Sequence, residues 1–75
     1  MEKKISDTKC IFAKRVKELR IEKGMRQKDL ADLLGYSAHG ISEWEARGKE
    51  PNFVTLMELA KLFSVTTDYL LGLED

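Results

Sequence analysis

The chain has 75 residues, with 13 basic and 13 acidic side chains and therefore a formal net charge of zero. This length allows one small domain, because a second hydrophobic core would lack the residues to form it. A single cysteine and a single histidine exclude an intrachain disulfide and a four-ligand zinc site. A hydrophobic content of 43% predicts a globular chain held together by apolar packing, with no metal and no cofactor.

Membrane and export signals are not expected. No stretch of the sequence approaches the ~18 apolar residues of a membrane span, and residues 1–9 lack the apolar core of a signal peptide. A lone cysteine suits a reducing compartment. These features predict a cytoplasmic protein without a membrane partner.

The neutral total conceals an asymmetry along the chain. Residues 1–28 carry ten basic and four acidic side chains, a net charge of +6, whereas residues 29–75 carry three basic and nine acidic ones, a net charge of −6. A basic half on a neutral chain is consistent with a polyanionic partner such as a nucleic acid. The same charges could equally form solvated helix faces, so charge alone leaves both interpretations open.

The first helix is predicted from about residue 9 to residue 23, where apolar side chains recur at the spacing of one helix face. Its N-cap is expected at residue 6, 7 or 8, and Gly24 ends it. Residues 1–8 are then expected to form a flexible N-terminal arm. A second, short helix is predicted over residues 27–34, stopping at Gly35.

Three further helices are predicted in the remainder of the chain. Ser37 can cap a third helix that reaches residue 46 or 47, and Asn52 can cap a fourth with an apolar stripe at residues 56, 59, 60 and 63. Thr66 can cap a last helix over residues 67–71, which leaves residues 73–75 as a tail. Met25 and Met57 lie beside apolar stripes and are expected to fill the core. The sequence therefore predicts a single all-α domain of five helices spanning residues 1–75.

The second and third helices are separated by a three-residue turn, residues 35–37, which is typical of a helix-turn-helix. At about 100° per residue, Ile41 and Trp44 define the inner face of the third helix. The opposite face then holds His39, Ser42, Glu43 and Ala46, with Ala38 on its flank. Such an outward face is what a recognition helix offers to the major groove of DNA.

Glu45 falls close to the inner face of the third helix. A carboxylate in that position needs a basic partner, because an unpaired buried charge is costly. A basic residue on the first helix is the natural candidate for that partner.

Four segments together resemble the phage-repressor (Cro/Xre) helix-turn-helix family. They are FAKRVKELR at 12–20, RQKDLADLLGYS at 26–37, ISEWE at 41–45 and LAKLFSVTTDYLLG at 59–72. The similarity covers roughly residues 10–72. It implies a compact five-helix, lambda-repressor-like DNA-binding domain, with the helix-turn-helix at helices 2 and 3, used as a homodimer on a two-fold symmetric double-stranded DNA operator.

The resemblance also implies roles for individual positions. Gln27 falls where the family contacts a DNA phosphate, and Arg20 and Glu45 match a buried ion pair. On this basis we expect base readout by Ser37, Ala38, His39 and Glu43. We expect phosphate contacts from Arg26, Gln27, Lys28, Ser42, Arg47 and Lys49.

The expected recognition face has unusual chemistry. Glu43 would repel phosphates unless it accepts a hydrogen bond from a cytosine amino group, and a solvated surface acid is the alternative. Ala38 offers only an apolar contact, for instance to a thymine methyl group. His39 could donate to guanine N7 or O6, or remain an exposed residue without a role.

The sequence departs from the family pattern at two glycines. Gly40 costs about 1 kcal/mol relative to alanine within a helix. Two residues separate Glu45 from Gly48 where the family commonly has one, so the following loop is expected to turn differently. Dimerisation is expected from the small size and the apolar tail, with Tyr69, Leu70 and Leu73 at the interface.

Two functions of different classes are compatible with these observations. The favoured one is a sequence-specific DNA-binding transcriptional regulator, a small prophage or bacterial repressor that occupies its operator as a nucleoid-associated dimer. The alternative is a protein-interaction module of the antitoxin or anti-repressor type, suggested by the zero net charge and the acidic recognition face. An enzyme is not expected, because the sequence has no phosphate-binding loop, no metal-ligand spacing and no catalytic constellation. No small-molecule ligand is predicted either.

Overall fold

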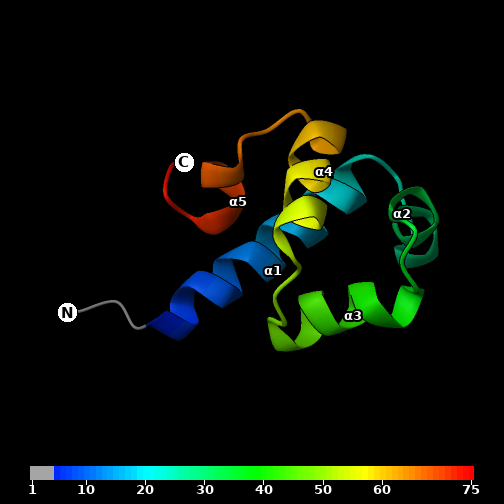
Figure 1. Cartoon of the computed structure of the whole chain (residues 1–75), viewed down its shortest axis with the longest axis horizontal. Helices are drawn as coiled ribbons and strands as arrows, with labels where there is room; N and C mark the ends of the chain where they lie inside the picture. The colour runs from blue at the N-terminus through cyan, green and yellow to red at the C-terminus, as the bar shows by residue number, and fades with distance from the viewer. Residues whose placement is uncertain (1–4) are drawn as a thin grey trace.

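The computed structural model describes the backbone of residues 5–75 and the side chains of residues 11–75 (Figure 1). Over this range the chain is helical, with no strand. The helices are α1 (Ile5–Glu22), α2 (Gln27–Leu34), α3 (Ala38–Arg47), α4 (Phe53–Phe63) and α5 (Thr67–Leu71). The predicted all-α domain with five helices is therefore confirmed.

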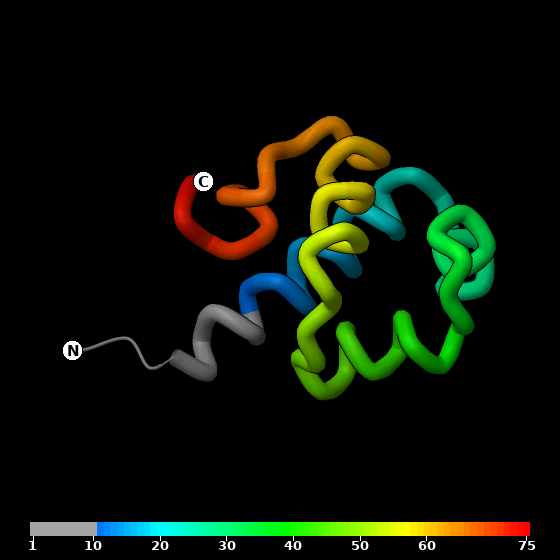
Figure 2. The backbone as a smooth tube through the Cα atoms, in the orientation of Figure 1, coloured from blue at the N-terminus to red at the C-terminus, as the bar shows by residue number. Residues whose placement is uncertain are grey.

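Figure 2 follows the backbone from α1 through α2 and α3 to α4 and α5, the last of which packs against α1. Helix α1 contacts α3 and α5, α2 contacts α3, and α4 contacts α5. Helix α3 lies along one edge of the molecule, at the bottom of the view in Figure 1. No helix in the described part of the chain is both long and apolar enough to cross a membrane.

The start of α1 differs from the sequence prediction. The helix begins at Ile5, so residues 5–8 are helical and the N-cap expected at residue 6, 7 or 8 is wrong. Residues 1–4 of the predicted arm lie outside the described residues. Residues 5–8 contain neither proline nor glycine, so their sequence does not oppose a helix.

Side-chain caps define the starts of three helices, as predicted. Ser37 Oγ accepts from the backbone N–H of Gly40 at 3.1 Å, and Asn52 Oδ1 accepts from Thr55 at 2.8 Å. Thr66 Oγ1 accepts from the N–H of Tyr69 at 3.0 Å. Each cap satisfies an amide that has no partner within its own helix.

The core is built from apolar side chains of all five helices. It consists of Phe12, Val16, Leu30, Ala31, Ile41, Trp44, Leu59, Ala60, Phe63 and Leu70. The expectation that Met57 fills this core is wrong, because the residue is 52% exposed. Met57 lies on the outer face of α4 with Phe53 and Val54, which are also exposed.

Gly40 has a packing role that offsets its low helix propensity. The ring of Tyr36 packs against that of Trp44 with a centroid distance of 4.9 Å. A Cβ atom at position 40 would lie 2.9 Å from Cδ2 of Tyr36, which is closer than real contacts allow. Glycine therefore lets the aromatic pair close over the start of α3.

Arg15 ties the C-terminal end of the chain to α1. Its guanidinium lies 4.1 Å from the centroid of the Tyr69 ring, within the range of a cation–π interaction. Its Nη1 donates to the carbonyl oxygen of Tyr69 and, at 2.6 Å, to that of Glu74. The tail at residues 73–75 is thus folded back along the domain.

Arg26 and Asp29 form a second local unit, at the start of α2. Asp29 Oδ2 accepts from the backbone N–H of Arg26 at 2.9 Å, and the Arg26 guanidinium donates to both carboxylate oxygens. The side-chain and backbone hydrogen bonds from Arg26 lower the pKa of Asp29 from 3.8 to about 2. The charged carboxylate therefore stabilises the first turn of the helix.

Replacing Gly40 with alanine tests the packing role of that glycine. In an ordinary helix the change would stabilise by about 0.5–1 kcal/mol. We expect Gly40→Ala to lower the free energy of unfolding instead, because the Tyr36 ring must leave Trp44. In a Tyr36→Ala background the same change should stabilise, as measured by urea unfolding. Stabilisation in both backgrounds would contradict the packing argument.

Acid titration tests the Arg26–Asp29 unit. The folded pKa of Asp29 lies below its unfolded value, so its stabilisation is complete above about pH 4 and is lost as the pH falls through about 2. Carboxyl ¹³C NMR of the folded protein should show a midpoint near 2 for Asp29. The variant Arg26→Gln should move this midpoint back toward 3.8. A midpoint near 3.8 in the unaltered protein would show that the hydrogen bonds do not persist in solution.

Candidate nucleic-acid interface

Helix α3 presents one buried and one open face. Ile41 and Trp44 are buried in the core, as the helical angles predict. On the other side Ala38, His39 and Ala46 are exposed, and Ser42 and Glu43 are half-buried. This open face belongs to a helix of 10 residues that lies at the edge of the molecule, where a partner of large radius can reach it.

The turn between α2 and α3 is set by backbone geometry. Gly35 ends α2 in the left-handed conformation, with φ at 69°, which glycine adopts without a steric penalty. The N–H of Tyr36 donates to the carbonyl oxygen of Ala31 at 2.8 Å, and Ala31 is almost fully buried. A small residue at this position lets the two helices approach closely. The pair therefore forms a helix-turn-helix.

An ion pair between Arg20 and Glu45 joins α1 to α3. Arg20 Nε donates to Glu45 Oε2 at 2.9 Å and Nη2 donates to Oε1 at 3.1 Å, a bidentate arrangement. The side chains are only 10% and 4% exposed, respectively. Arg20 Nη1 also donates to the carbonyl oxygen of Met25 at 2.7 Å, in the turn before α2. The pair thus fixes the orientation of α3 relative to the rest of the domain.

Gln27 is joined to this ion pair. It is the first residue of α2, and its Nε2 donates to Glu45 Oε1 at 3.1 Å. This contact brings the start of α2 against the last turns of α3. The sequence predicted a phosphate contact for Gln27 but gave no sign of its link to Glu45, because 18 residues separate the two positions.

Three of the basic residues predicted to contact phosphates have acidic partners within their own helices or caps. Arg26 pairs with Asp29 at 3.0 Å, Lys28 with Asp32 at 3.1 Å, and Arg47 with Glu43 at 3.4 Å. All three basic side chains are largely exposed. The candidate surface therefore carries less free positive charge than its count of lysines and arginines suggests. In contrast, the side chain of Lys49 forms no ion pair within 4.0 Å in the described part of the chain.

A hollow of about 250 Å³ lies beside α3. It is lined by Tyr36, Ser37, His39, Gly40, Glu43, Trp44, Lys49 and Glu50. Four of the predicted DNA-contact residues thus share one surface: Ser37, His39, Glu43 and Lys49. Tyr36 and Glu50 also line the hollow, although the sequence did not assign them to the site. Only their positions, beside the turn and in the loop after α3, could have indicated this. Ala38, Ser42 and Arg47 lie elsewhere on α3. Arg26 is the N-cap of α2, and Gln27 and Lys28 are its first two residues.

The end of α3 explains the shifted glycine. Arg47 remains helical, and Gly48 takes the left-handed conformation with φ at 67°. The backbone N–H of Gly48 donates to the carbonyl oxygen of Trp44 at 3.0 Å, and that of Lys49 to Glu43 at 3.3 Å. The additional residue before Gly48, Arg47, therefore lies within α3, and Gly48 ends the helix.

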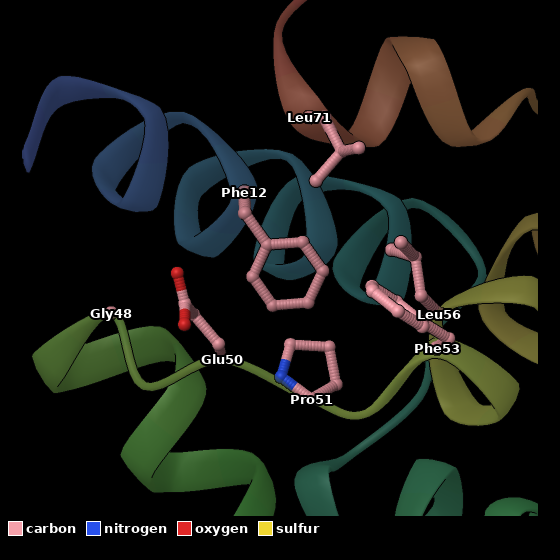
Figure 3. Close-up of a pocket in the computed structure, with 7 residues that line it drawn as sticks. All are labelled: Phe12, Gly48, Glu50, Pro51, Phe53, Leu56 and Leu71. Carbon is pink, nitrogen blue, oxygen red and sulfur yellow. The ribbon is translucent and has the colours of Figure 1, made fainter. Parts of the chain in front are cut away.

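A second pocket, of about 200 Å³, opens between α1, the loop after α3, and the helices α4 and α5 (Figure 3). Its walls are Phe12, Gly48, Glu50, Pro51, Phe53, Leu56 and Leu71. The Glu50 carboxylate is the only charged group on these walls, whereas ligand sites combine apolar walls with several convergent polar groups. We therefore do not place the functional site in this pocket. The described residues also contain no group of three or more acidic, histidine or cysteine side chains that could hold a metal ion.

The residues predicted for a dimer interface are divided by the structure. Leu70 is fully buried in the core of the monomer, so its side chain offers no surface to a partner. In a helix of five residues, one position must face the core to attach it, and in α5 that position is Leu70. Tyr69 is half-buried beneath Arg15, and Leu73 is 73% exposed.

Comparisons with known proteins agree with this geometry. A helix-turn-helix family model matches residues 16–70. The HTH-type transcriptional regulator ImmR of Bacillus subtilis is 39% identical over 64 residues, which cover 85% of this chain and 50% of that protein. The SPbeta prophage-derived HTH-type regulator YonR of the same organism is 38% identical over 61 residues, covering 81% and 56%. Repressor protein C2 of Salmonella phage P22 is 34% identical over 61 residues, covering 81% and 28%.

The chain spans about half the length of the first two relatives. The family predicted from the sequence is confirmed, since the matched region includes α2, the turn and α3 in full. The buried ion pair and the open face of α3 lie within the same region. The chain belongs to the Cro/C1-type helix-turn-helix family.

Proposed function

We propose that the chain is a sequence-specific DNA-binding transcriptional regulator that represses by occupying its operator. The observation that carries this proposal is the open polar face of α3, held in a fixed orientation by the buried Arg20–Glu45 pair. Such a face can enter the major groove while the rest of the domain remains outside. The names of the relatives, which include transcriptional regulators and a phage repressor, support the same conclusion.

Base readout is proposed for the outer face and the start of α3. Ser37 uses its hydroxyl oxygen as the helix cap, so its O–H remains available to donate to a base or a phosphate. His39 can donate to guanine, Ala38 can contact a thymine methyl group, and Glu43 can accept from a cytosine amino group. Glu43 is partly neutralised by Arg47, which lessens its repulsion of the DNA backbone.

Phosphate contacts are proposed on both sides of this face. Gln27 and Lys28 lie at the start of α2, where the positive end of the helix dipole also favours an anion. Arg47 and Lys49 lie at the end of α3, and Ser42 lies between them and the start of the helix. A phosphate must replace a carboxylate partner at Arg26, Lys28 and Arg47, but not at Lys49. Electrostatic affinity for DNA is therefore proposed to be moderate.

The regulator is proposed to act in the cytoplasm, as a dimer on a two-fold symmetric operator. A domain this small reads few base pairs, so two copies are needed for a selective site. Leu73 and the edge of Tyr69 are the remaining candidates for the contact between copies, since Leu70 is buried. No cofactor and no catalytic step form part of this proposal.

A protein-interaction module of the antitoxin or anti-repressor type is the second candidate. It is favoured by the exposed apolar side chains of Phe53, Val54 and Met57 on the outer face of α4. Adjacent exposed apolar residues often mark a protein contact. The two candidates differ in whether the chain alone selects a DNA sequence.

Selection of DNA fragments from a random pool tests the proposed function. We expect enrichment of one sequence, with affinity at least about 1000-fold above that for unrelated DNA. We also expect two related half-sites about 10 base pairs apart, because a dimer presents its recognition helices about 34 Å apart. Recovery of single half-sites would contradict the dimer. Absence of any enrichment at about 50 mM salt would contradict the regulator and favour the protein-interaction module.

Releasing Lys28 from its acidic partner tests the role of charge pairing. We expect Asp32→Asn to strengthen DNA binding by roughly two- to fivefold, because Lys28 no longer exchanges a carboxylate for a phosphate. The log–log salt slope should become steeper by up to about 0.9. The matched control is Glu58→Gln, which removes one exposed negative charge from α4. Equal effects of both variants would show that only net charge matters, and not the pairing of Lys28.

A further inference from the structure

Gln27 is linked to the buried ion pair by a single hydrogen bond. Its Nε2 donates to Glu45 Oε1 at 3.1 Å. The same carboxylate accepts hydrogen bonds from Arg20 Nε at 2.9 Å and from Arg20 Nη2 at 3.1 Å. The Glu45 side chain is only 4% exposed. Because the guanidinium makes two hydrogen bonds to the carboxylate, the oxygen that accepts from Gln27 has a fixed position.

The chemistry of this contact decides which way the Gln27 amide points. An ionised carboxylate can only accept hydrogen bonds, so the amide nitrogen must face Glu45 and the amide oxygen must face away. The nitrogen carries two protons, of which Glu45 takes one. Gln27 is half-buried and stands between the exposed residues Arg26 and Lys28, so its side chain is partly open to the outer surface.

We propose that the Arg20–Glu45 pair positions the Gln27 amide so that this second proton is donated to a DNA phosphate. The inference rests on the proposed DNA-binding function and names Arg20 and Glu45 as positioning residues that do not touch DNA. A phosphate oxygen accepts and never donates, so a glutamine with its oxygen outward cannot bind it. Fixing the nitrogen side before DNA arrives removes that wrong orientation and the cost of ordering the side chain.

This contact has a distinctive thermodynamic signature. Gln27 is neutral, so its bond to a phosphate releases no condensed counterion, whereas a lysine or arginine contact does. Loss of the Gln27 contact should therefore lower affinity without changing the salt slope. A purely structural role of Gln27 would instead lower the melting temperature and leave the affinity of the folded protein unchanged.

The first experiment examines the side-chain amide directly by ¹⁵N NMR. Gln27 is the only glutamine of the chain and Asn52 the only asparagine, so the spectrum contains two side-chain NH₂ groups. In the free protein we expect the Gln27 Nε2 order parameter to approach the rigid value of about 0.85. On addition of the selected duplex, one of its two protons should shift. An order parameter below about 0.6, or no shift of either proton, would overturn the proposal.

The second experiment measures affinity for the selected duplex over a range of salt concentrations. We expect Gln27→Met, which keeps the length but removes the donor, to weaken binding roughly 10-fold with an unchanged salt slope. The matched control Lys49→Met should reduce the slope by about 0.9. Unaltered affinity of Gln27→Met would overturn the proposal.

A double-mutant cycle then connects Gln27 to Glu45. In a Glu45→Gln background the loss caused by Gln27→Met should shrink to less than about threefold, because the amide is already free to turn. An undiminished loss would overturn the positioning role. If Glu45→Gln does not fold, the NMR experiment on the unaltered chain still decides between a held and a mobile amide. Failure of the DNA selection itself would contradict the proposed function, whereas a mobile Gln27 in a chain that binds DNA contradicts only this inference.

Discussion

A guanidinium and a carboxylate, both almost removed from water, meet where α1, α2 and α3 converge. Burying two charges is costly, and the pair is tolerated because its groups are extensively hydrogen-bonded: Arg20 reaches Met25 as well as Glu45, and Glu45 also receives Gln27. None of the buried side-chain polar atoms in the described residues lacks a partner. Removing one member of such a pair typically costs about 3–5 kcal/mol. Apolar residues could hold the same helices together, but they would not fix the last turns of α3 with the same directional bonds.

Charge pairing recurs on the outer surface with a different consequence. The pairs Lys28–Asp32 and Arg47–Glu43 join neighbouring turns of α2 and α3, and each adds a little to the stability of a short helix. The same carboxylates weaken the field that would draw DNA toward the domain. In the proposed complex with DNA, affinity would therefore depend on the fit of α3 to its site more than on long-range attraction. The zero net charge of the chain is consistent with that balance.

Local signals in the sequence were sufficient for much of the fold. The starts of three helices are predictable from their caps, Ser37, Asn52 and Thr66, because a cap depends on only a few neighbouring residues. The sequence does not define the start of α1, because three consecutive polar residues could each act as a cap and the helix begins before all of them, at Ile5. Met57 was misplaced because α4 has apolar residues on most of its circumference, so its stripe does not define one buried face.

The candidate site was predictable only in part, for a related reason. The open face of α3 follows from helical angles, and an acid near its inner face requires a basic partner. The bond between Gln27 and Glu45, and the burial of Leu70 while Leu73 remains exposed, depend on how helices meet. Sequence spacing contains no information about such contacts. The acidic partners of Arg26 and Lys28 could have been predicted from the sequence, since they lie three and four positions further along the chain.

The position of Gly48 has a consequence for comparisons with relatives. Each residue added to a helix advances it by about 1.5 Å and turns it by about 100°, so Arg47 projects in a different direction from a residue that begins a loop. An alignment that places the inserted position in the loop after α3 therefore assigns the wrong direction to the side chain of Arg47. A copy of α3 transplanted into a relative would have to carry its own terminating loop. Without that loop, the graft would carry the outward-facing side chains of α3 but not the geometry with which the helix ends.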